Sequence, residues 1–129
     1  MSGRFLPPDH SRGDANTIGG YAAVHARPAA FEGSDGMSYS VEIVVDDTGV
    51  AGRPFGAYFL FLRWRRMGAQ GVEGHLETDY LAYGSTEEAA RDAIGQLTLT
   101  AVKRMLDELI REQLANRPTR RWWDAMRDE

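Results

Sequence analysis

Residues 55–65 carry a large apolar side chain at most positions, and this segment constrains the fold more than any other part of the chain. If the segment, FGAYFLFLRWR, forms a β-strand, its successive side chains point to opposite faces. Both faces are then apolar. One carries Phe55, Ala57, Phe59 and Phe61, and the other carries Tyr58, Leu60, Leu62 and Trp64. Such a strand belongs at the centre of a sheet with cover on each side.

Alternating segments before and after this strand predict its partners. Residues 37–46 alternate apolar and mostly polar side chains, which is typical of an antiparallel strand with one wet face. Residues 75–83 alternate in the same way after a loop at 66–74 that contains three glycines. A weaker alternation at 21–27 predicts the first strand. We therefore expect a four-stranded, mainly antiparallel meander.

A long amphipathic helix is predicted to follow the sheet. Ser85 is a natural N-cap, and Glu88 completes an S-x-x-E capping box. From residue 86 to about 116, apolar residues recur at spacings of three and four, which marks a buried helix face. The predicted class is α+β, with one long C-terminal helix packed on one face of the sheet.

This helix is longer than a typical strand, so we expect its far end to overhang the sheet or to bend. Gly95 and the segment 98–100 are the expected places for a bend. Asn116 and Pro118 are expected to end the helix.

The chain of 129 residues has the size of one domain, which we place at residues 20–116. Residues 1–19 are rich in Pro, Gly and polar side chains and are expected to form a flexible arm. Residues 117–129 form a C-terminal tail that contains Trp and Arg.

Composition narrows the function classes. The chain has no cysteine, which excludes disulfides, thiolate metal sites and a cysteine nucleophile. It has no signal-peptide pattern and no run of eighteen apolar residues, so we expect a cytoplasmic protein that does not span a membrane. Its formal net charge of −4 opposes nonspecific binding to nucleic acid.

His75, Glu77 and Asp79 are the candidate metal or acid/base residues. They share one face of a predicted strand in steps of two, about 7 Å apart. Such a set is compatible with a hard divalent ion. The alternative is a solvated strand face whose acids pair with arginines of the neighbouring strand. We favour the alternative because no H-x-x-x-H or E-x-x-H spacing is present. We therefore expect no catalytic residues, no metal site and no cofactor.

Arg63, Trp64, Arg65 and Arg66 form a candidate nucleic-acid patch, because guanidinium groups bind phosphate and an aromatic ring can stack on a base. The alternative is that Trp64 covers the sheet edge while the arginines keep the hairpin tip in water. The acidic net charge favours this alternative.

Arg120, Arg121, Trp122 and Trp123 form the second Arg/Trp cluster. Tryptophan and arginine are enriched in interface hot spots, and the polar tail offers these rings no core of its own. The tail caps the open end of its own core, docks on another subunit or partner, or stays disordered, and the sequence leaves these three alternatives open. The candidate partner-binding residues are Tyr58, Leu60, Leu62, Trp64, Arg121, Trp122 and Trp123.

The order of strands followed by a helix, with Gly-Ser-Thr-Glu-Glu-Ala-Ala at the junction, resembles the HicB type of antitoxin. The resemblance covers Met37 to about Ile110 and implies a nucleic-acid-associated regulator. The chain departs from that pattern in its longer loops, its longer helix and the lack of a DNA-binding segment after the helix.

Three functions remain open from the sequence. The central strand is apolar on both faces and one helix covers only one of them, so we expect a second copy or a protein partner on the other face. The sequence leaves open which row faces the helix. The contact is made either by Tyr58, Leu60, Leu62 and Trp64 or by the opposite set, Phe55, Phe59 and Phe61. Our first hypothesis is a noncatalytic interaction or assembly domain, most simply a homodimer. The alternatives are a nucleic-acid-associated regulator and a small-ligand-binding domain with a pocket near His75 and Tyr80.

Overall fold

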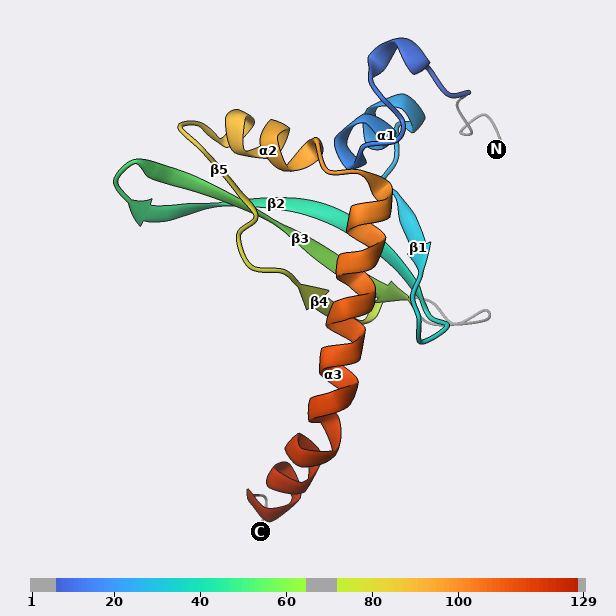
Figure 1. Cartoon of the computed structure of the whole chain (residues 1–129), viewed down its shortest axis with the longest axis vertical. Helices are drawn as coiled ribbons and strands as arrows, with labels where there is room; N and C mark the ends of the chain where they lie inside the picture. The colour runs from blue at the N-terminus through green and yellow to red at the C-terminus, as the bar shows by residue number, and fades with distance from the viewer. Residues whose placement is uncertain (1–6, 65–71, 128–129) are drawn as a thin grey trace.

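The computed structural model describes residues 7–64 and 72–127, and the surroundings of side chains in 7–64 and 73–115. It has one antiparallel sheet with helices packed on one face, which confirms the predicted α+β class (Figure 1). The elements in chain order are a 3₁₀ helix η2 (His10–Arg12), α1 (Ile18–His25), β1 (Ala30–Glu32), β2 (Ser38–Val50), β3 (Arg53–Trp64), β4 (Val72–Glu77), β5 (Ala82–Gly84), α2 (Glu87–Gly95) and α3 (Leu99–Arg127).

The sheet has the order β1-β2-β3-β4, with β5 also paired to β3. β2 and β3 form its longest ladder, which runs from Ser38 opposite Trp64 to Val50 opposite Arg53. The predicted central position of β3 and the meander are thus confirmed.

The predicted fourth strand at 75–83 is divided in two. β4 and β5 both pair with β3, and residues 78–81 leave the ladder between them. The hydroxyl of Thr78 accepts a hydrogen bond of 3.1 Å from the backbone N–H of Phe59. In an unbroken strand, a backbone carbonyl would accept the hydrogen bond from the N–H of Phe59. Here the hydroxyl of Thr78 accepts it instead.

The predicted strand at 21–27 is wrong, because these residues belong mainly to α1. Thr17 caps α1 by accepting a 3.0 Å hydrogen bond from the N–H of Gly20, and Ala26 ends it with a left-handed φ of 56°. Alanine favours helix over strand, and the cap outweighs the alternation of small side chains. The first strand is instead β1.

α1 is held closely against the end of α2 and the link between α2 and α3. The N–H of Ile18 donates to the carbonyl of Leu97 at 2.8 Å, and a Cβ on Gly19 would lie 3.0 Å from the Cα of Gly95. Ile18, which the sequence analysis placed in the N-terminal arm, is buried. The division of the chain into arm, domain and tail stays a prediction.

The long helical segment bends where the sequence predicted. α2 ends at Gly95, and α3 begins at Leu99 in a different direction (Figure 1). The predicted cap is one residue off: Thr86, and not Ser85, accepts the 3.0 Å hydrogen bond from the N–H of Ala89. The S-x-x-E pattern is present in the sequence, but the helix begins one residue later than that pattern requires.

The predicted end of the helix at Asn116 and Pro118 is also wrong, since α3 runs to Arg127. Proline removes one backbone donor from a helix. The residues on either side of Pro118 include Leu114, Ala115, Arg120 and Arg121, which are good helix formers.

The core lies between the sheet and the helices. From β3 it takes Ala57, Phe59 and Phe61, all fully buried. The helices contribute mainly Ile94, Val102, Leu106 and Ile110. The row of β3 side chains that faces the helices is therefore Phe55, Ala57, Phe59 and Phe61. The sequence alone left open which of the two rows this would be.

Candidate protein-interaction surface

The second apolar side of β3 faces away from the helices. Tyr58, Leu60 and Leu62 are half-buried and Trp64 is 39% exposed, whereas every core residue of β3 is fully buried. None of the four belongs to the core cluster formed by the described residues. The alternation of the strand thus places one apolar row in the core and leaves the other on the surface.

Two tyrosines from the segment after β4 extend this row. The ring centroid of Tyr80 lies 5.9 Å from that of Tyr58 and 6.0 Å from that of Tyr83. Gly56 makes room for Tyr80, because a Cβ at this position would lie 2.8 Å from the tyrosine ring. The guanidinium of Arg53 lies 4.9 Å from the centre of the Tyr83 ring. We call this surface the open face. The apolar residues that define it here are Tyr58, Leu60, Leu62, Trp64, Tyr80 and Tyr83, and Val44 of β2 lies beside Tyr58 on the same face.

The open face exposes a large aromatic area. Trp64, Tyr80 and Tyr83 are 39%, 37% and 40% exposed. Aromatic side chains offer 150–250 Å² each, so these rings leave roughly 60–100 Å² apiece in water. With the half-buried leucines between them, the patch reaches the size of roughly 300–600 Å² at which apolar patches on monomers are often functional.

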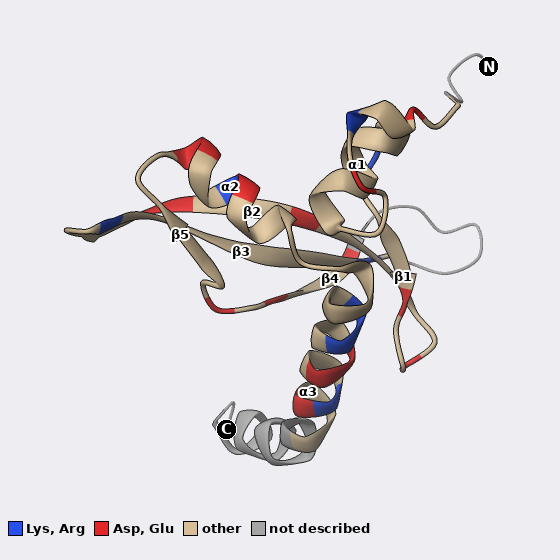
Figure 2. Cartoon of the chain, turned by 45° about the horizontal axis from the view of Figure 1, so that its top comes forward, with Lys and Arg blue, Asp and Glu red and all other residues tan. Residues whose placement is uncertain are grey.

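Carboxylates border the apolar row. Leu60 lies between Glu42 of β2 and Glu77 of β4 in the sheet register. The hydroxyl of Tyr80 donates a 3.0 Å hydrogen bond to Asp46. Figure 2 shows acidic positions in red along β2 and on the segment that links β4 to β5.

The carboxylates also act on the tyrosines. Partial burial raises the pKa of Tyr58, and the negative charges of Asp46 and Glu77 raise it further. The pKa of Tyr80 is raised mainly by its hydrogen bond to Asp46. Burial and hydrogen bonding dominate the two shifts, and the nearby negative charges add to them. The placement of Glu42, Asp46 and Glu77 makes the open face acidic as well as aromatic.

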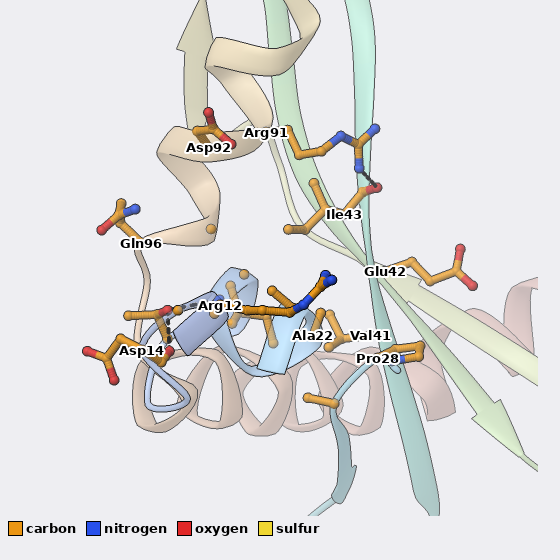
Figure 3. A pocket seen from close by; sticks show the side chains of 18 of the residues that line it. Arg12, Asp14, Ala22, Pro28, Val41, Glu42, Ile43, Arg91, Asp92 and Gln96 are labelled. Atoms are coloured by element: carbon orange, nitrogen blue, oxygen red, sulfur yellow. Dashed lines mark hydrogen bonds between the residues drawn. The ribbon is translucent and has the colours of Figure 1, made fainter. Parts of the chain in front are cut away.

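A hollow of about 910 Å³ lies on another side of the molecule, between α1, α2 and β2. Figure 3 shows Arg91 of α2 reaching the backbone carbonyl of Ile43, to which it donates a 3.2 Å hydrogen bond. Arg12, Asp14 and Asp92 also line the hollow. The sequence analysis missed this hollow because it interpreted α1 as a strand.

No protein-family model, no curated protein and no solved structure matches this chain.

The structure places two of the three candidate metal residues on the open face. His75 lies beside Leu62 in the register, and its Nε2 is 3.6 Å from a carboxylate oxygen of Glu77. Asp79 follows in the link between β4 and β5 and is exposed. Among the described residues, no group of three His, Asp or Glu side chains is placed to hold a metal ion. The expected pocket near His75 and Tyr80 differs in place from the hollow, which neither residue lines.

The arginine patch is divided between two sides of the sheet. Arg63 lies on the helix-covered side, with its guanidinium 4.0 Å from the carboxylate of Asp35. Trp64 lies on the open face, where its indole N–H donates a 2.9 Å hydrogen bond to the hydroxyl of Ser40. Arg65 and Arg66 lie outside the described residues. Alternation along β3 therefore separates Arg63 from Trp64.

The tail residues Arg121, Trp122 and Trp123 lie within α3, but their side chains are outside the described part of the chain. Within the described residues, no helix combines the length and the apolar character that a membrane crossing requires.

Proposed function

We propose that the chain is a noncatalytic protein-interaction domain that self-associates through the open face. The observation that carries this proposal is the two-sided apolar character of β3: one row is sealed by helices and the other remains on the surface. A sheet face of this kind is stabilised when a second surface removes its rings from water.

The dimensions of the open face suit an interface. β3 has 12 residues, which span about 40 Å at roughly 3.3 Å per residue. Three neighbouring strands spaced about 4.8 Å apart give the face a width of about 15 Å, and hence an area of about 600 Å². A standard interface takes about 800 Å² from each partner, so this face supplies most of one side.

The face is also a rigid platform. β2 and β3 pair along most of their length, and the core packs directly beneath them. A surface that is already ordered loses little conformational entropy on binding, which favours affinity for a given buried area. This rigidity fits a docking role.

The test is the mass in solution of the full chain at micromolar concentration, measured by analytical ultracentrifugation. We expect a dimer. The variant Leu60→Glu should be monomeric, because it replaces an apolar side chain near the middle of the face with a charge that any covering surface would have to remove from water. Val50→Glu is the matched control, since Val50 is 54% exposed and lies at the β2–β3 turn away from the face.

Both variants should keep the circular dichroism spectrum and cooperative melting of the parent chain. A monomeric parent chain, or a Leu60→Glu variant that dimerises as the parent does, would overturn the proposal. Retention on heparin that weakens with added salt would instead favour the nucleic-acid alternative.

A further inference from the structure

The charge of the open face determines what kind of surface can cover it. In a two-fold dimer built from two identical patches, each patch meets its own copy. Glu42 and Glu77 flank Leu60 near the middle of the face. Packing two open faces on each other would bring these carboxylates together and would be opposed by like-charge repulsion. The favoured occupant is therefore apolar and basic.

The chain itself contains such a segment. Residues 117–123, RPTRRWW, hold three arginines and two tryptophans with no acidic residue. Arginine pairs with carboxylates and also packs on aromatic rings. The ring of Tyr80 lies beside the rings of Tyr58 and Tyr83. A tryptophan ring of the segment would add a large apolar contact on their solvent-facing side. Segment and face are complementary in charge and in ring content.

The path of α3 makes this segment available to another molecule. Among the side chains of α3 that the structure describes, Ile110 is the last in the core, and Leu114 is already 50% exposed. The helix continues from Ile110 to Arg127, which corresponds to about 25 Å at 1.5 Å per residue. It also leaves the sheet from the helix-covered side, opposite the open face. As far as Ile110, α3 therefore packs on the side of the sheet opposite the open face.

We propose that segment 117–123 of one copy docks on the open face of a second copy, with its arginines beside Glu42 and Glu77. Reciprocal exchange of the two segments closes a two-fold dimer. The inference rests on the proposed self-association and adds the identity of the occupant.

Charge reversal on full-length chains tests this contact. The face variant carries Glu42→Lys and Glu77→Lys, and the tail variant carries Arg120→Glu and Arg121→Glu. Each variant alone should raise the dimer dissociation constant at least tenfold. An equimolar mixture of the two should form a heterodimer with an affinity close to that of the parent homodimer, because each reversed face then meets a tail of opposite charge.

The matched control reverses two acidic residues on the exposed side of α3, Glu108→Lys and Glu112→Lys, and should dimerise as the parent does. Melting curves should show that all variants remain folded.

The outcomes separate the inference from the proposed function. A tail variant that dimerises normally, while Leu60→Glu is monomeric, overturns the tail contact and leaves the interaction face standing. Two weakened variants whose mixture fails to restore the dimer also overturn the contact, since the reversed charges then do not meet. A monomeric parent chain overturns both.

Discussion

The phenol hydroxyl of Tyr39 donates a hydrogen bond of 2.7 Å to the carboxylate of Asp35. The other oxygen of that carboxylate accepts a 3.0 Å hydrogen bond from the backbone N–H of Met37, which closes the turn between β1 and β2. The guanidinium of Arg63 lies 4.0 Å from the same carboxylate. Tyr39 itself is fully buried, so this polar cluster anchors the turn to the core.

Replacing Tyr39 with Phe should lower the free energy of unfolding by about 1–2 kcal/mol, because the acceptor on Asp35 loses a buried partner while the ring still fills its site. Urea denaturation followed by circular dichroism measures this change. Tyr21→Phe is the control, since no hydrogen bond of the Tyr21 hydroxyl is found among the described residues; it should change stability little. Equal stability of the Tyr39→Phe variant and the parent would show that the bond contributes nothing.

Stability should also fall with rising pH between about 10 and 12. Burial, followed by the hydrogen bond to Asp35, raises the pKa of Tyr39 from 10.0 to about 12. The folded chain thus holds the phenol proton more tightly than the unfolded chain does. This stabilisation is complete below pH 10 and is lost as the pH rises through 12. Urea midpoints measured across this range should fall less steeply for Tyr39→Phe, and equal slopes would contradict the assignment.

The start of α2 offers a direct comparison of two neighbouring cap candidates. Thr86→Ala removes the hydroxyl that accepts from the N–H of Ala89 and should cost about 1 kcal/mol. Ser85→Ala should have a much smaller effect, because Ser85 is exposed and precedes the cap. Thermal and urea unfolding of both variants checks this order, and a larger loss at Ser85 would restore the cap that the sequence predicts.

Local patterns were sufficient for much of the architecture. Strict alternation at 37–46 and the two apolar rows of 55–65 predicted β2 and β3, because side-chain direction in a strand has a period of two whatever its neighbours are. Gly95 and the segment 98–100 likewise marked the bend between α2 and α3, since glycine and threonine weaken a helix locally.

Local patterns failed where contacts distant in sequence determine the structure. The segment 21–27 is helical because Thr17 caps it and because Gly19 allows close packing on Gly95 of α2, some 75 residues later. No alternation within 21–27 contains that information. The hollow beside α1 was missed for the same reason.

The sequence by itself determined that β3 has two apolar rows, because this follows from the order of its side chains. Only the tertiary structure decided which row is sealed: helices α2 and α3 pack on the side of Phe59 and Phe61, and the side of Leu60 and Trp64 stays open. Alternation along the strand determines that the two rows lie on opposite faces of the sheet, but it does not determine which face the helices cover. Their placement depends on how distant segments pack together, a choice made by the whole core and not by any one strand.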